Sequence, residues 1–180
     1  PVVVRITQAM IFGLREKGDL GGDVYSLDLD MEKMSSVQID ILKNWVKKGH
    51  NILFWGQHQA SYYDVLFSDA IECRKRVANE QASFSKHPVN TDAKDLFFYR
   101  EETNGRQTFQ PLTKYPNDTE VIVSCKSGVI AGRVPYGLGN IYFALHYNKW
   151  NAGSDKDRWT LNFNHWMLGL RVPGGADTSI

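Results

Sequence analysis

The sequence predicts an α/β fold: a mostly parallel, doubly wound sheet with helices on both faces, followed by a C-terminal β-meander and a last helix. Residues 24–56 have the order strand, helix, glycine turn and buried strand, which is the βαβ signature of a parallel sheet. Three short β-rich runs succeed one another between residues 120 and 145. A stretch of helical periodicity that Ser154 or Asp155 can cap comes after them.

The first two strands are expected near the N-terminus. Residues 2–6 are β-branched and mostly apolar, as in a strand that is buried on both faces. Residues 24–30 alternate between apolar and polar side chains and end in acidic residues. Three glycines between residues 18 and 22 separate the two predicted strands.

The clearest helix spans residues 35–48. Ser35 and Gln38 form a capping-box pattern at its start, and Gly49 supplies a stop at its end. The apolar face at helical spacing consists of Val37, Ile41, Leu42, Trp45 and Val46. Residues 52–56 follow at once as a short apolar run, so we expect a buried strand there.

The middle of the chain predicts a second helix and a hairpin. A helix is expected over residues 62–77, because four apolar residues share one face before a short basic run. Asn104-Gly105 is a turn signal, so residues 96–99 and 108–109 are expected to pair as a hairpin. We see no repeat in the sequence and expect one domain over residues 1–180.

The β-meander is predicted from three runs at residues 120–124, 129–134 and 140–145. Lys126-Ser127-Gly128 and Tyr136-Gly137-Leu138-Gly139 separate them. The second separator is rich in glycine, as phosphate-binding loops are, but it lies between strands rather than before a helix. We therefore expect a hairpin turn and no phosphate site.

The amino-acid composition argues against two classes of function, generic nucleic-acid binding and membrane spanning. The 180 residues carry 21 Lys and Arg against 20 Asp and Glu, so the net charge of +1 gives no field for generic nucleic-acid binding. The longest apolar runs fall far short of the roughly 20 residues of a membrane span. Because the sequence begins at Pro1 without a leader, we expect a processed protein or a domain excised from a longer one.

The two cysteines do not indicate a compartment. Cys73 and Cys125 lack CxxC or zinc-ligand spacing, so no structural metal site is predicted, and a disulfide between them stays open. Asn117-Asp118-Thr119 has the form of an N-glycosylation acceptor, whose use depends on a secretory route. Localisation and oligomeric state therefore stay open.

Two strings resemble class I glutamine-amidotransferase-like domains. SSVQIDILKNWVKKGHNILFWG at residues 35–56 resembles their unit of helix, glycine and hydrophobic strand. VIAGRVPYGLGNIYFALHYNKW at residues 129–150 resembles their closing hairpin, which leads to a last strand and a C-terminal helix. Trehalose-utilisation-protein-like domains and related non-catalytic domains, including one of an intraflagellar-transport subunit, share this outline. The resemblance covers roughly residues 20–56 and 120–170 and implies a flavodoxin-like, doubly wound fold.

The resemblance also implies what chemistry to look for. In true amidotransferases a cysteine nucleophile occupies a tight strand-to-helix elbow, and a His-x-Glu pair follows the last strand. Neither Cys73, expected in a helix, nor Cys125, expected before a β-turn, occupies such an elbow. His146 follows the last strand, but Asn148 stands where the acid would be. The resemblance therefore implies a domain without the amidotransferase mechanism.

Candidate site residues lie in three loops at the carboxyl ends of predicted strands, where open parallel sheets bind ligands. The first loop holds Asp28 and Asp30, which suit a cation or acid–base work and equally suit a solvated strand end. The other two loops contribute the candidate ligand-binding residues Gln57, His58, Gln59, Ser61, Tyr62, Asp64, His146 and Asn148. Ser61 with His58 makes a nucleophile and base only if a third group orients the histidine.

The candidate catalytic residues are His146, His58 and Asp28. They could surround a divalent metal, because imidazole and carboxylate groups often coordinate the same ion. A lone histidine at a strand end is, however, more often structural. No cofactor is predicted.

The preferred function is a non-catalytic module that binds a small polar ligand or a protein partner. The first alternative is a hydrolase or isomerase of the trehalose-utilisation-like group, acting on a sugar-like molecule through His146, His58 and Asp28 or Asp64. The second alternative is a structural subunit of a larger assembly. An enzyme requires that the candidate side chains converge in a concave pocket.

Overall fold

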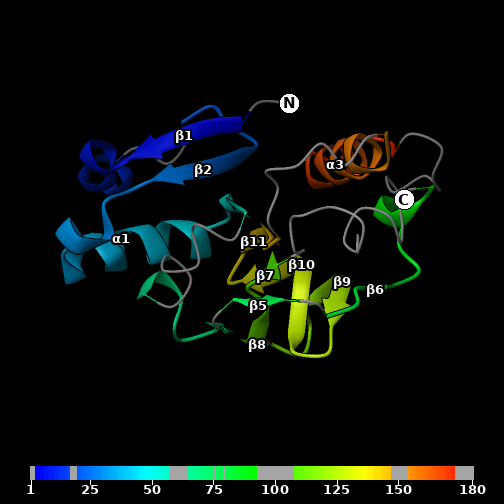
Figure 1. The fold of residues 1–180 in the computed structure, drawn as a ribbon. Coiled ribbons are helices and arrows are strands. Elements are labelled where there is room, and N and C mark those ends of the chain that lie inside the picture. Colours follow the sequence, from blue (N-terminus) through cyan, green and yellow to red (C-terminus); the bar gives the residue numbers. More distant parts are fainter. Residues whose placement is uncertain are drawn as a thin grey trace.

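The computed structural model describes residues 3–16, 20–56, 65–74, 76–78, 80–92, 108–146 and 154–172. Figure 1 shows the arrangement of its helices and strands. In chain order the elements are β1 (Val3–Thr7), η1 (Gln8–Arg15), β2 (Val24–Asp28), η2 (Met31–Lys33), α1 (Ser36–Lys47), β3 (Asn51–Trp55), β4 (Glu72–Cys73), β5 (Val77–Ala78), β6 (Ser83–Phe84), η4 (Pro88–Asn90), β7 (Thr108–Phe109), β8 (Leu112–Lys114), β9 (Glu120–Cys125), β10 (Gly128–Tyr136), β11 (Gly139–Ala144) and α3 (Ser154–Met167).

The main sheet confirms the α/β class. Its nine strands include the path β1-β2-β3-β11-β10-β8-β4, with β9 on β10 and β6 on β9. The first four strands of the path are parallel, as expected. The remaining pairings are antiparallel, so the prediction of a mostly parallel sheet holds for one half only. Short turns join β9 to β10 and β10 to β11, and a chain that reverses so tightly must pair antiparallel.

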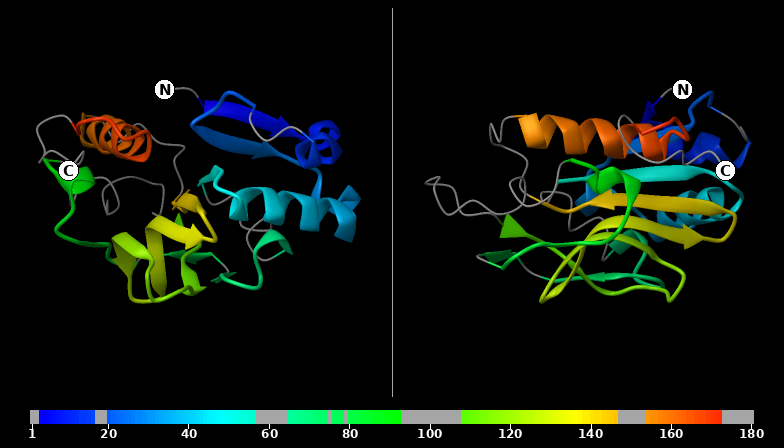
Figure 2. Two further views of the ribbon diagram at one scale, coloured as in Figure 1. Left: turned by 180° about the vertical axis from the view of Figure 1, so that it is seen from behind. Right: turned by 90° about the vertical axis from the view of Figure 1, so that its right-hand side faces the viewer.

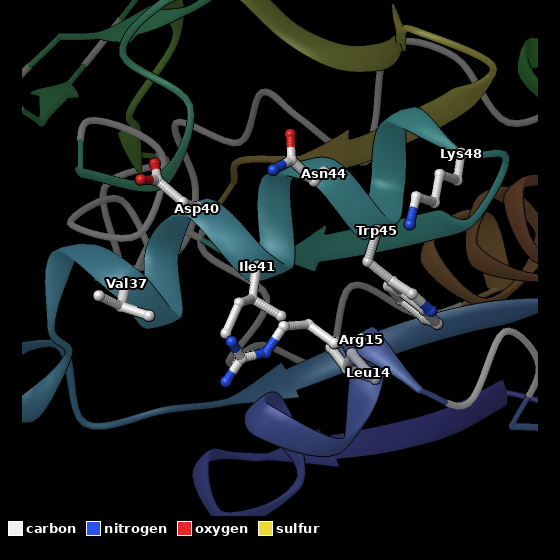
Figure 3. A pocket seen from close by; sticks show the side chains of 8 residues that line it. All are labelled: Leu14, Arg15, Val37, Asp40, Ile41, Asn44, Trp45 and Lys48. Carbon is white, nitrogen blue, oxygen red and sulfur yellow. The ribbon is translucent and has the colours of Figure 1, made fainter.

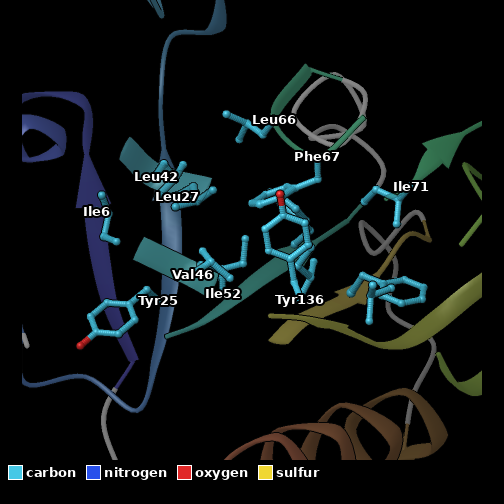
Figure 4. Packing of buried hydrophobic residues seen from close by; sticks show 14 of the residues in the cluster. Ile6, Tyr25, Leu27, Leu42, Val46, Ile52, Leu66, Phe67, Ile71 and Tyr136 are labelled. Carbon is cyan, nitrogen blue, oxygen red and sulfur yellow. The ribbon is translucent and has the colours of Figure 1, made fainter. Parts of the chain in front are cut away.

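Helices cover both faces of the parallel half (Figure 2). Side chains alternate along β3, so Ile52 and Phe54 pack with α1, whereas Leu53 and Trp55 pack with α3. Figure 4 shows the cluster on the α1 face, where Leu42 and Val46 meet Ile52. In the described part of the chain, no helix combines the length and apolar character of a membrane span.

Helix α1 forms where its cap and periodicity predict it. The Ser35 hydroxyl accepts a hydrogen bond from the Gln38 amide N–H at 3.2 Å, and Gln38 Oε1 accepts one from the Ser35 amide N–H at 2.9 Å. Gly49 ends the helix with φ of +125°, a conformation that glycine adopts at little cost. Four of the five predicted face residues are buried, and only Val37 is exposed.

The predicted meander is confirmed as β9, β10 and β11. Gly137 and Leu138 form the turn between β10 and β11, so this segment is a hairpin turn as expected. A Cβ atom at Gly137 would lie 2.7 Å from Lys47 Cα, and its φ is +60°. Glycine therefore lets the turn approach the end of α1.

The predicted helix over residues 62–77 is wrong in its second half. Only Val65 and Leu66 are helical within its described part, and the chain then turns into β4. Cys73 thus lies in a strand, where it pairs with Leu112 of β8. Pairing of this segment with β8 therefore outweighs the helical spacing of its apolar residues.

The predicted hairpin around Asn104-Gly105 lies largely outside the described residues. Its second arm, Thr108–Phe109, is β7, which pairs antiparallel with β5. The proposed first arm at residues 96–99 is among the residues that the structure does not describe.

The two cysteines are free and cannot pair in this fold. Cys73 pairs with Leu112, Leu112 with Val129, and Val129 with Ser124, the neighbour of Cys125. The two cysteines are therefore separated by three strand spacings, or about 14 Å. A disulfide requires Cα atoms within about 7 Å.

Candidate functional site

The parallel pairing of β3 and β11 brings together the strand ends that precede two of the predicted site loops. Ala144 pairs with Trp55, and the Gly56 amide N–H donates to the Ala144 carbonyl at 2.7 Å. The carboxyl ends of β3 and β11 therefore lie side by side. The predicted residues that lie outside the described part of the chain are Gln57, His58, Gln59, Ser61, Tyr62, Asp64 and Asn148.

His146 lies in the core. Its side chain faces α3 and is 0% exposed. The imidazole centroid lies 5.4 Å from the ring of Trp55 and 5.6 Å from that of Trp159, each in an edge-to-face arrangement. The residue also forms a β-bridge with Phe109. A general base must come within hydrogen-bonding reach of its substrate, and this ring has no solvent-exposed surface in the structure.

The fold does not place Asp28 next to His146. It ends β2 with a side chain that is 64% exposed, and its Oδ2 lies 3.9 Å from Arg5 Nη1. β3 runs between β2 and β11, so Asp28 and His146 stand two strand spacings apart, or about 10 Å. Asp28 is a solvated strand end in this structure.

Asp30, the second acid of this loop, has a local structural role. Its Oδ1 accepts a hydrogen bond of 3.2 Å from the Glu32 amide N–H, which caps η2. Its other oxygen lies 3.8 Å from Lys33 Nζ.

The structure does not test the predicted metal site as a whole. Among the described residues, no group of three or more His, Cys, Asp or Glu side chains is placed to hold a metal ion. His58, one of the three residues in that hypothesis, lies outside the described part, so the site stays a prediction.

A second polar cluster, which the sequence did not indicate, joins η4 to the antiparallel half of the sheet. Glu120 Oε2 lies 3.7 Å from His87 Nε2 and 3.5 Å from Arg133 Nε. The hydrogen bond from His87 lowers the pKa of Glu120; burial opposes this effect, and the charge of Arg133 adds to it. Arg133 also donates to Asn140 at 2.8 Å. These groups satisfy one another, so the cluster is a structural ion network.

A third polar cluster borders a hollow of about 410 Å³ over β8, β9 and β10. The Ser127 amide and hydroxyl both donate to the Glu80 carboxylate. Burial raises the pKa of the Cys125 thiol to about 11, and the neighbouring Glu80 charge adds to the shift. A thiol that stays protonated at neutral pH is a poor nucleophile, so this hollow lacks a reactive cysteine.

The strand pairings of these clusters explain why they were missed. His87 is 33 residues from Glu120 in the sequence, and Glu80 is 47 from Ser127. No motif spacing links either pair, and the antiparallel register of β6 and β9 brings the partners together.

Comparisons with known proteins show the fold alone. No family model matches the chain, and no curated protein matches it in sequence. The solved structure "mmIFT52 N-terminal domain" is similar at 11% identity with a TM-score of 0.56, over 92% of this chain and 97% of that one. "Cytoplasmic Protein STM1381 from Salmonella typhimurium LT2" is similar at 10% identity with a TM-score of 0.51, over 81% of this chain and 69% of that one.

Proposed function

We propose that this chain is a non-catalytic, amidotransferase-like binding domain with a flavodoxin-like, doubly wound arrangement. One observation carries the proposal. His146 follows the last strand, where the resemblance expects the amidotransferase histidine, and its ring is enclosed between Trp55 and Trp159. A histidine that packs as a core residue is not exposed to a substrate, so in this proposal His146 does not act as a general base.

The cysteines support the same proposal. Cys73 lies in β4 and Cys125 ends β9 before a two-residue turn, so neither begins a helix whose dipole would lower its pKa. The likeness to the mmIFT52 N-terminal domain, which extends over nearly all of that domain, supports a module that occurs within larger proteins.

The ligand of the proposed module is a small polar compound or a protein segment, bound beside the ends of β3 and β11. The segment after β3 contains Gln57, His58, Gln59, Ser61, Tyr62 and Asp64, a dense set of hydrogen-bonding groups. No cofactor is part of the proposal.

A thermal-shift screen combined with turnover assays tests this function. Divalent metals, sugars, sugar phosphates and glutamine are added to the wild type, His58→Ala and His146→Ala. We expect no turnover, and an upward shift of the melting temperature with a polar compound, which His58→Ala abolishes. We expect His146→Ala to lower the basal melting temperature, because it leaves a cavity in an aromatic core.

Two results would contradict the proposal. Hydrolysis of glutamine is one. Turnover of a sugar or sugar phosphate that His146→Ala abolishes at an unchanged melting temperature is the other, and it would favour the hydrolase or isomerase.

A second candidate function, a structural subunit, is favoured by the open edge of the sheet. Among the described strands β1 pairs only with β2, and its exposed Val3 lies on the outer side of the parallel half. Free strand edges are templates for pairing with another chain. Sedimentation of the wild type and of Arg5→Pro tests this candidate, which predicts an assembly that the proline variant disrupts.

A further inference from the structure

A solvent-open groove lies where η1 meets α1 (Figure 3). Leu14 and Arg15 of η1 lie beside Ile41 and Trp45 of α1. The groove has a volume of about 230 Å³. Pockets for small molecules usually measure about 300–1,000 Å³, so this groove is better suited to a single large side chain.

The floor of the groove is apolar, and exposed apolar side chains lie beside it. Leu14, Ile41 and Trp45 form the floor and are less than a tenth exposed. Val37 on α1 is 51% exposed, and Phe12 on η1 is 49% exposed. Val37 lines the groove and Phe12 contacts Arg15, which also lines it, and exposed apolar side chains beside an apolar floor are typical of a surface that a partner covers.

The hydrogen-bonding groups of the groove are mostly donors. Arg15 and Lys48 carry positive charges at the rim, and neither forms an ion pair within the described part of the chain. The Arg15 guanidinium lies 5.5 Å from the centroid of the Phe12 ring. Asp40 is the one acid among the lining residues, and Figure 3 shows it pointing away from Arg15.

Trp45 adds an unsatisfied donor. Its indole N–H is buried and has no acceptor among the described residues. Buried donors are normally paired, and tryptophan is enriched at the centres of protein interfaces. An interaction of Arg15 and Lys48 with helix dipoles would explain their charge, but not the exposed Val37.

We propose that this groove docks an acidic segment of a protein partner. One large apolar side chain of the partner sits against Leu14, Ile41 and Trp45, and flanking carboxylates face Arg15 and Lys48. This inference goes beyond the proposed function, because it concerns the layer of η1 and α1 rather than the ends of β3 and β11.

Selection from a library of short random peptides displayed on phage tests the proposal. The immobilised wild-type chain is the target, and recovered peptides are then measured against variants by fluorescence anisotropy. We expect peptides with Asp or Glu around one large apolar residue, and binding that weakens at least about tenfold with Arg15→Glu/Lys48→Glu. Val37→Asp should weaken binding as well, because it places a charge on the apolar rim.

Lys86→Glu/Lys126→Glu is the matched control, because it changes the net charge equally at two exposed lysines outside the groove. This control variant should bind the recovered peptides as tightly as the wild type does. Melting temperatures of all variants must match before affinities are compared. The proposal is overturned if no peptide depends on Arg15 and Lys48, if the control weakens binding as much, or if the recovered peptides lack acidic residues. Because no catalytic assay is involved, this failure is distinct from failure of the proposed function.

Discussion

The phenol of Tyr136 donates a hydrogen bond of 2.8 Å to Oδ2 of Asp69, and Lys43 Nζ lies 3.3 Å from the other carboxylate oxygen. Burial by itself would raise the pKa of Asp69, but the hydrogen bonds from Tyr136 and Lys43 outweigh it, and the pKa is lowered. The carboxylate thus ties the end of β10 and the helix α1 to the segment before β4.

Tyr136→Phe should lower the free energy of unfolding by about 1 kcal/mol, since it removes one hydrogen bond to a charged group and keeps the ring contact with Phe67. Urea denaturation at pH 7 measures the change. Tyr115→Phe is the control, because Tyr115 is exposed and should leave the midpoint where it is. Equal midpoints for both variants would show that the bond to Asp69 contributes nothing.

Glu120→Gln should destabilise the protein at pH 7 by up to about 1 kcal/mol, because the carboxylate is partly exposed. The pKa of Glu120 is lowered in the folded state, so its stabilisation is present above the unfolded pKa of about 4.3 and is lost as the pH falls. The difference in melting temperature between wild type and variant should therefore shrink below about pH 4. A difference that stays constant from pH 7 to pH 3 would contradict the ion network, and the exposed Glu16→Gln serves as a control.

The thiol of Cys125 should react slowly with iodoacetamide. Because burial and the Glu80 charge raise its pKa to about 11, the thiolate fraction at pH 7 is small. The Cys73→Ser variant isolates this thiol, and its labelling rate by mass spectrometry should rise with pH past the range of an ordinary cysteine. A second variant, Cys73→Ser/Glu80→Gln, should react faster at pH 9. Labelling of both variants at the rate of an unfolded peptide at neutral pH would show that the site is open.

Gly139→Ala should cost about 2–3 kcal/mol of folding free energy. A Cβ atom there would lie 2.2 Å from the carbonyl oxygens of both His50 and Val46, and backbone must move to admit it. Gly13→Ala is the matched control, because a Cβ atom at Gly13 meets no heavy atom within 4 Å. Chemical denaturation of the two variants compares them, and similar losses would mean that the contact of α1 with β11 is not tight.

Local patterns were the predictable part of the fold. The capping box of Ser35 and Gln38, the glycine at residue 49 and the turn at Gly137 each involve neighbours in sequence, so the residues themselves indicate the structure. The strands β4 and β8 could not be found in this way. Each is only two or three residues long, and their pairing joins Cys73 to Leu112 across a long separation.

In the candidate site, too, the local features were predictable and the long-range contacts were not. The order of strand and loop correctly placed His146 after the last strand. Its burial depends on Trp55 and on Trp159, which come from other elements. Position after a strand is the same for a catalytic histidine and a packed one, and only the tertiary contacts distinguish them.

Strand β3 pairs with β2 on one side and with β11 on the other, and Ala144, the partner of Trp55 in β11, lies about half of the chain further on. During synthesis on the ribosome the apolar edge of β3 therefore emerges long before the strand that covers it. Such an edge is exposed to aggregation until the meander is complete. Truncation before residue 139 removes β11 and should therefore leave this edge of β3 uncovered.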